Sequence, residues 1–309
     1  MTTTTTRTLT SKQIDSVGSL LKDDRQPMGA RFRALFTLKN VAGKAAIDHI
    51  CEALVKDESA LLKHECAYCL GQMQDSHAIA TLETVLANTS EHPMVRHEAG
   101  EALGAIGTDQ CLNILLKFQN DPCKDVAETV VLAVNRINHL KGNANGGDGR
   151  ESSIYSSVDP APPLEEKEVD SVEIEKLGQI LVDEKESLFK RYQAMFTLRN
   201  INSDESAMAL ANGLDCPDSA LFRHEIAFVL GQMQKPVTTD KLAEVLAQKT
   251  ENEMVRHECA EALGAIATDK ANNILKDYLS DEARVVRESA IVALDVSDYN
   301  NSEQFQLLE

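Results

Sequence analysis

The sequence has no tryptophan, and aromatic residues make up only 4% of its 309 residues. Cores that depend on large aromatic side chains, such as those of β-sandwiches, are therefore disfavoured, and helices packed through small residues are favoured. No run of 18 apolar residues occurs, which excludes an ordinary transmembrane helix. The opening residues MTTTTTRTLT lack the apolar stretch of a secretory signal. We therefore expect a soluble, cytoplasmic protein without a membrane partner.

Basic residues are also scarce. The chain has 31 lysines and arginines against 49 acidic residues, a formal charge of −18. Nucleic acids require a basic protein surface, so we expect no nucleic-acid partner, whereas a cationic partner would be attracted. Seven cysteines, an odd number spread along the chain, argue against a secreted disulfide framework. Hydrophobic residues make up 43% of the chain, which is enough to form hydrophobic cores. We also expect the chain to be a monomer.

The chain repeats itself at an offset of 160 residues, and we refer to residues 160 positions apart as mates. Residues 93–107 and 253–267, for example, share 11 of 15 residues, and one register without gaps holds from about residue 14 to 140. The duplication predicts two domains, 10–140 and 169–300. The segment 141–168 between them holds four of the 15 glycines and three of the eight prolines, which predicts a flexible tether.

Each half contains a shorter period. Arg31, His64 and His97 lie 33 residues apart, and so do their mates. Helical spacing of apolar residues follows each of these positions, and a weaker helical pattern precedes it. Two helices in every 30–33 residues predict an all-α solenoid of HEAT-like repeats, with four helix pairs in each of two pseudo-symmetric halves. The tetratricopeptide repeat has a similar period, but its aromatic signature is missing here.

The duplication separates the eight histidines into two groups. Four of them have histidine mates, stand in a Lys/Arg-His-Glu context and precede a glycine by seven residues. The other four histidines have mates of other types. The four histidines with histidine mates form four His-Glu pairs. His64-Glu65 is the mate of His224-Glu225, and His97-Glu98 is the mate of His257-Glu258.

The residues alone leave two interpretations of these His-Glu pairs. In the first, the pairs only cap or pack their helices, since a glutamate in the first turn suits the helix dipole. However, the first and fourth units of each half lack the pair, and a framework residue should recur in all four. In the second, equivalent positions of stacked repeats converge on one surface and bind metal. Two histidines and a carboxylate favour Fe(II), although zinc accepts the same ligands.

Glycines and cysteines near the histidines were weighed in the same way. Gly71 and Gly231 lie two helical turns beyond His64 and His224, where a missing side chain lets either a substrate or another helix approach closely. We predict both glycines as substrate-binding candidates, with helix packing as the alternative. Cys66 and Cys69 have the spacing of a zinc or redox motif, but their mates are apolar, which favours small core residues.

The blocks LLKHE…LGQM and MVRHE…EALGAI, with their mates, resemble the deoxyhypusine hydroxylase family over nearly all of both halves. The resemblance implies a HEAT-repeat monooxygenase with two non-haem Fe²⁺ ions per chain and dioxygen as co-substrate. Its one partner would be the hypusine-containing translation initiation factor in its deoxyhypusine form. Hydroxylation of that residue would complete hypusine. The resemblance does not identify the external reductant.

The resemblance also implies roles for individual residues, with no catalytic residue beyond the metal centre. One iron would be bound by His64, His97 and Glu98. The other would be bound by His224, His257 and Glu258. Glu65 and Glu225 would lie beside the metals, either as ligands or as acceptors for the amines of the substrate.

Three rival functions remain on the sequence alone. A non-catalytic HEAT scaffold with an acidic face predicts no bound metal. A HEAT-like bilin lyase predicts chromophore binding and leaves the mirrored His-Glu pairs unexplained. A zinc hydrolase would need a nucleophile or general base beyond the metal ligands, and the sequence offers none at mirrored positions.

Overall fold

The computed structural model describes residues 9–41, 43–142, 153–164 and 173–301, and within them the chain is helical without any strand. Helices of the first half alternate between an outer and an inner layer. The outer helices are α1 (Ser11–Lys22), α3 (Lys44–Lys56), α5 (Ile79–Ala87, preceded by the short η1, Ser76–Ala78) and α7 (Asp109–Leu115). The inner helices are α2 (Met28–Val41), α4 (Ala60–Met73), α6 (Pro93–Ile106) and α8 (Lys124–Gly142).

The second half repeats this order. Its outer helices are α9 (Ile174–Val182), α11 (Asp204–Ala211, followed by η4, Asn212–Asp215), α13 (Thr239–Ala247, preceded by η5, Pro236–Thr238) and α15 (Asp269–Lys276). Its inner helices are α10 (Leu188–Ile201), α12 (Ala220–Met233), α14 (Glu253–Ile266) and α16 (Arg284–Asn300). The prediction of an all-α HEAT-repeat fold with four helix pairs in each half is confirmed.

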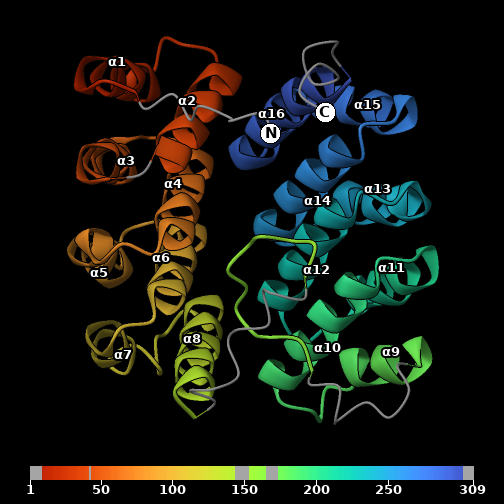
Figure 1. Cartoon of the computed structure of the whole chain (residues 1–309). Coiled ribbons are helices and arrows are strands. Elements are labelled where there is room, and N and C mark those ends of the chain that lie inside the picture. The colour runs from red at the N-terminus through yellow and green to blue at the C-terminus, as the bar shows by residue number, and fades with distance from the viewer. Residues whose placement is uncertain (1–8, 42, 143–152, 165–172, 302–309) are drawn as a thin grey trace, which may run out of the picture.

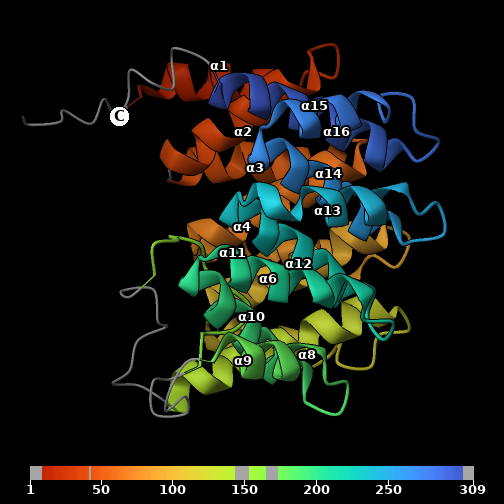
Figure 2. The ribbon, with the colours of Figure 1, turned by 90° about the vertical axis from the view of Figure 1, so that its right-hand side faces the viewer.

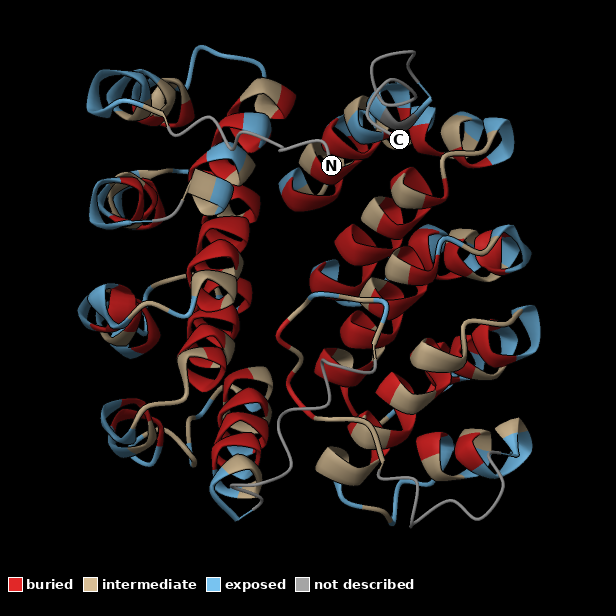
Figure 3. Cartoon of the chain, viewed as in Figure 1, coloured by how far each residue is buried: buried red, intermediate tan, exposed pale blue. Residues whose placement is uncertain are grey.

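The two halves face each other through their inner helices, in opposite order (Figure 1). α2 lies across from α16, and α8 lies across from α10 and α12. Seen from the side, the helices stack one above another over the length of the molecule (Figure 2). Buried residues concentrate on the inner helices, while the outer helices expose their far sides (Figure 3). Each half therefore has its own core, and the two inner layers enclose the centre of the molecule.

A buried basic residue joins successive repeats. The Nε atom of Arg96 donates to the carbonyl oxygen of Leu86 at 2.9 Å, and its Nη2 lies 2.6 Å from a carboxylate oxygen of Asp121 in the next repeat. Such a guanidinium satisfies a carbonyl and a carboxylate at once, which an ammonium cannot do with the same geometry. The arginine immediately before His97 thus joins α6 both to α5 of its own repeat and to the next repeat.

This contact corrects the register of the first repeat. Arg31 donates to the carbonyl oxygen of Leu21 and pairs with Asp57, as Arg96 does with its own partners. Arg31 is therefore equivalent to the basic residue before a histidine, and the alignment of Arg31 with His64 at a spacing of 33 was wrong by one residue. Phe32 occupies the histidine position of the first repeat. The loops between repeats differ in length, so no single period fits every junction.

The connection between the halves includes an ordered stretch, residues 153–164, which we name the strap. Val158 and Ala161 of the strap are buried. The backbone of Val158 exchanges two hydrogen bonds with the Gln72 side chain of the first half, at 2.8 and 3.2 Å. The Leu164 N–H donates to Thr197 of the second half at 2.9 Å. Within the predicted tether, residues 143–152 and 165–168 lie outside the described residues, whereas the strap packs on both halves.

Candidate metal centre

The four mirrored histidines meet at the centre of the molecule, one from each of α4, α6, α12 and α14. Around the ring His64–His97–His224–His257, neighbouring imidazole centroids lie 5.3–5.4 Å apart, and those of His64 and His224 lie 5.7 Å apart. All four side chains are buried, with His97 and His257 fully so. The opposed halves therefore bring together residues almost 200 positions apart.

The eight ring nitrogens of these histidines are all buried, and none has a hydrogen-bond partner among the residues that the structure describes. A buried polar atom without a partner costs roughly 1–3 kcal/mol, so eight at one place require an explanation. The Nε2 atom of His64 lies 3.2 Å from a Glu98 oxygen, and His224 lies equally close to Glu258, but neither pair is aligned as a hydrogen bond. Coordination of a metal ion would satisfy nitrogens placed in this way.

Burial and mutual repulsion keep three of the four imidazoles neutral, those of His97, His224 and His257. Burial first, and the nearby His64 second, lower the pKa of His224 to about 3. Burial lowers the pKa of His97 well below its ordinary value, with His224 as the next cause, and that of His257 likewise, with His64 next. The neutral imidazole is the form that binds metal, so these histidines need not lose a proton before coordination.

Two groups of side chains have ligand atoms close enough for a single ion. Those of His64, His97 and Glu98 all lie within 4.8 Å of one another, and so do those of His64, His224 and His257. Glu258 Oε2 lies 3.2 Å from His224 Nε2 and 3.9 Å from His257 Nε2. The first group is the predicted ligand set of one iron. The second group contains both histidines of the other predicted set, with His64 in place of Glu258.

The carboxyl groups around the histidines lack compensating positive charge. Burial, with the nearby Glu261, raises the pKa of Glu65 to about 8. Burial and the nearby Glu258 raise the pKa of Glu98 to about 8. The pKa of Glu225 and of Glu258 is raised well above its ordinary value, again by burial first and by neighbouring glutamates second. Ionised carboxylates at this site therefore require cations beside them.

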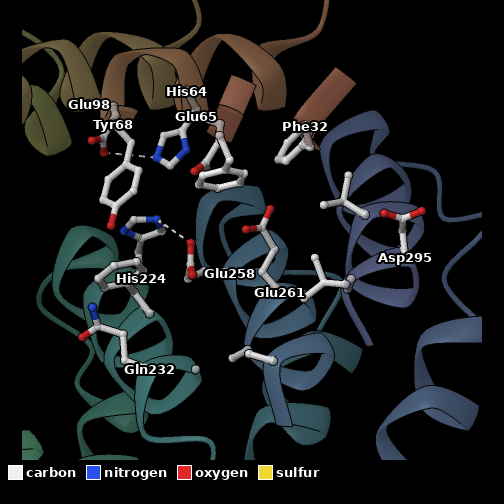
Figure 4. Close-up of a pocket in the computed structure, with 18 of the residues that line it drawn as sticks. Phe32, His64, Glu65, Tyr68, Glu98, His224, Gln232, Glu258, Glu261 and Asp295 are labelled. Carbon is white, nitrogen blue, oxygen red and sulfur yellow. Dashed lines mark ion pairs between the residues drawn. The ribbon is translucent and has the colours of Figure 1, made fainter. Parts of the chain in front are cut away.

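A cavity of about 350 Å³ opens beside the histidines (Figure 4). Phe32, Phe36, Tyr68 and Phe228 contribute aromatic walls. Acidic residues occupy its inner end, next to the imidazoles. The lining glutamates are Glu65, Glu98, Glu101, Glu225, Glu258 and Glu261. An apolar passage that ends in carboxylates suits a long aliphatic ligand with positive charge.

Comparisons with known proteins agree with this arrangement. The family model described as HEAT repeats matches residues 208–295, and that described as PBS lyase HEAT-like repeat matches 62–88 and 95–121. Deoxyhypusine hydroxylase of Danio rerio is 53% identical over 96% of this chain and 95% of that protein. The Homo sapiens protein of that name is 52% identical, with the same shares covered. The chain belongs to the deoxyhypusine hydroxylase family.

A solved structure of human deoxyhypusine hydroxylase in complex with glycerol matches this fold with a TM-score of 0.88 and 51% identity. The match covers 94% of this chain and 97% of the human one. The chain is thus a deoxyhypusine hydroxylase by family, an oxidoreductase, and the sequence-based identification is confirmed. The alternative of a non-catalytic scaffold is therefore wrong, because the relatives are enzymes. The bilin lyase alternative is also wrong, because the lyase-like model matches single repeats whereas the hydroxylases match 96% of the chain. The family's hydroxylation is metal-dependent, and the His-Glu cluster is where this chain could bind the metal.

The glycines of this deoxyhypusine hydroxylase chain pack helices against each other. A Cβ atom on Gly71 would lie 2.8 Å from the Cα of Ala102, and one on Gly231 would lie 3.1 Å from the Cα of Ala262. The packing interpretation is therefore confirmed at both positions. Gly231 also lines the cavity whereas Gly71 does not, so only Gly231 lies where a substrate could approach.

Two mirrored glutamates at the site escaped the sequence analysis. Glu101 and Glu261 are mates, four residues after His97 and His257, and both line the cavity. Glu261 accepts a hydrogen bond from Ser289 at 3.3 Å, and its Oε1 lies 3.7 Å from His257 Nδ1. The signal was available, because the same offset that selected the histidines also pairs these glutamates. The described residues contain no helix both long and apolar enough to cross a membrane.

Proposed function

We propose that this chain hydroxylates the deoxyhypusine residue of the hypusine-containing translation initiation factor, with dioxygen, at a centre of two Fe²⁺ ions. His64, His97 and Glu98 would bind one iron. His224, His257 and Glu258 would bind the other. The observation that carries the proposal is the set of eight buried, unpartnered imidazole nitrogens beside carboxylates. Neutral imidazoles with one carboxylate for each ion are the ligands that non-haem Fe(II) favours.

Bound iron would supply the redox chemistry that side chains lack, namely activation of dioxygen for attack on an unactivated C–H bond. The overall reaction consumes the C–H bond, dioxygen, two electrons and two protons, and yields the alcohol and water. An external reductant supplies the electrons. The aromatic walls formed by Phe32, Phe36, Tyr68 and Phe228 would enclose the aliphatic part of the substrate and exclude water.

Glu65 and Glu225 would bind the amines of the substrate. Both line the cavity on opposite halves, beside His64 and His224. A substrate ammonium within hydrogen-bond distance would favour the ionised carboxylate and so lower the raised pKa of Glu65. Two carboxylates on opposite walls would hold a long amine at two points, which places one methylene group at the metals.

The direct test combines metal analysis with product analysis. Protein purified without chelator should contain close to two irons per chain, and the iron-loaded protein should convert the deoxyhypusine form of the translation factor to the hypusine form. One zinc per chain, or no hypusine in the presence of reductant and dioxygen, would refute the proposal. His64→Ala should lose iron and activity. His77→Ala is the matched control, because His77 has no histidine mate and lies partly exposed beside Asp48.

A further inference from the structure

The cavity obeys the internal symmetry only at its inner end. Ten of its lining residues form five mate pairs around the histidines. The remaining lining residues have no mate in the lining, and most come from one side, formed by α2 and α16 together with the facing surface of α14. The pairs are His64/His224, Glu65/Glu225, Tyr68/Phe228, Glu98/Glu258 and Glu101/Glu261. A fully symmetric cavity would extend from the histidines towards both ends of the inner layers. This cavity extends towards α2 and α16 only.

The lining reaches the surface between α2 and α16. Arg33 of α2 forms an ion pair with Asp295 of α16, and their side chains are 56% and 34% exposed. Val296 beside them is 38% exposed. Figure 4 shows Asp295 on α16, well away from the histidines. Gly29 lets α2 approach the Asp295 side chain closely, because a Cβ atom there would lie 2.5 Å from the Asp295 carboxylate carbon.

At the mirrored side, between α10 and α8, larger side chains replace these residues. Phe189 is the mate of Gly29, and Arg136 is the mate of Val296. Arg199, the mate of Lys39, is 1% exposed, and its guanidinium lies over the Tyr155 ring at 4.5 Å. None of these residues lines the cavity. The larger side chains thus fill, between α8 and α10, the space that corresponds to the open end of the cavity.

The strap covers this filled side. Asp159 of the strap accepts two hydrogen bonds from Arg199, at 2.6 and 2.9 Å, and its carbonyl oxygen accepts one from Arg136 at 2.8 Å. A planar guanidinium can make this bidentate contact, whereas the ammonium of the mate Lys39 cannot. A chain with two halves has one connection between them. That connection can therefore cover only one of the two symmetry-related sides.

We propose that the substrate side chain reaches the histidines only between α2 and α16, and that the strap closes the equivalent path between α8 and α10. This inference deepens the proposed function, on which it rests, by assigning the surface on which the substrate protein docks. The glutamates at the inner end of the cavity lie beyond this mouth. A cationic side chain that enters between α2 and α16 is therefore attracted towards the histidines.

Photo-crosslinking tests the entrance without any catalysis. Benzoylphenylalanine is placed at position 37, an exposed position on α2 near the mouth, or at position 135, an exposed position on α8 at the strap side. Each protein is irradiated with the deoxyhypusine form of the translation factor. We expect crosslinks from position 37 and none from position 135. Crosslinks mainly from position 135, equally from both, or from neither would overturn the proposal.

A substitution that copies the closed side onto the open one gives a second measurement. Val296→Arg places at the mouth the residue type that its mate position carries, at a site that is 38% exposed. It should lower kcat/KM for the protein substrate by about tenfold or more, with iron content and melting temperature retained. Phe189→Ala, on the closed side, is the control and should leave kcat/KM within about twofold. A Val296→Arg enzyme with unchanged kcat/KM would refute the entrance while leaving the activity established. If position 37 gave crosslinks but the wild-type enzyme formed no hypusine, the proposed function would be refuted and the entrance would not.

Discussion

The two halves of this chain agree at the centre and disagree at the ends. The second and third repeats of both halves place histidine and glutamate at matching positions, and these residues meet in one site. The terminal repeats of each half keep the fold but differ in sequence at equivalent positions. Gly29 corresponds to Phe189, and Lys39 corresponds to Arg199. A metal centre that requires both halves constrains their centres alike. A substrate that needs one path leaves the ends free to differ.

The largest expected effect tests the equivalence of the two centres. His97→Ala and His257→Ala should each lower the activity by at least about 100-fold and should each lose bound iron, because each removes one ligand of an equivalent set. Activity assays and metal analysis on both variants are the measurement. If one variant kept near-normal iron and activity, the two halves would not contribute equally, and the centre would be asymmetric like the ends.

The ends should respond unequally to matched substitutions. Arg199→Ala removes a buried guanidinium that holds the strap and leaves Asp159 unpaired, so unfolding should require roughly 3–5 kcal/mol less free energy. Lys39→Ala, at the mate position, should cost less than about 1 kcal/mol, since the Lys39 ammonium lies over the partly buried Phe36 ring at 5.3 Å, a contact of modest energy. Denaturant unfolding measures both. Equal losses would show that the strap does not depend on Arg199.

The pH dependence of stability should distinguish the empty centre from the metal-bound one. Burial raises the pKa of Glu65 and Glu98 to about 8, so the folded metal-free protein binds more protons than the unfolded chain up to that pH. Its stability is then greatest at low pH for these groups and falls as pH rises towards 8. The lowered pKa values of His97, His224 and His257 act in the opposite direction. This effect is small between pH 7 and 8, because unfolded histidines, with a pKa of about 6.5, have lost most of their protons by pH 7.

Between pH 7 and 8 the metal-free protein should therefore lose up to about 1 kcal/mol for each such glutamate, seen as a fall in melting temperature. Glu65→Gln should weaken this fall. Protein loaded with iron should show little change over the same range, since the cations stabilise ionised carboxylates. A metal-free protein whose melting temperature rises from pH 7 to 8 would contradict the assignment.

The smallest expected effect concerns two symmetric helix caps. Ser59 caps α4 and Ser219 caps α12, and each hydroxyl also donates to a glutamate of the opposite half, Glu288 at 2.5 Å and Glu128 at 2.6 Å. Ser59→Ala and Ser219→Ala should each cost about 1 kcal/mol, a shift of roughly 2–4 °C in melting temperature. Calorimetry of the two variants measures the comparison. A difference above about 2 kcal/mol would show that the interface between the halves is not symmetric.

Much of the site was predictable because duplication acts as an internal comparison. His64 and His97 were separated from His77 solely because their mates are histidines, and the structure places all four mirrored histidines together. Glu101 and Glu261 satisfy the same test and were missed because they do not adjoin a histidine. The register of the first repeat failed at Arg31, since a buried arginine and a metal-binding histidine occupy adjacent positions and a period alone does not distinguish them.

The sequence by itself determined the helices, their pairing into repeats and the identity of the mirrored residues, because periodicity and self-similarity are local or internal properties of the chain. Only the tertiary structure decided that the halves oppose each other in reverse order, that the strap packs against Arg199, and that the cavity opens on one side. These features depend on contacts between residues about 40 to 260 positions apart. Such contacts follow from how two surfaces fit, and no pattern along the chain records that fit.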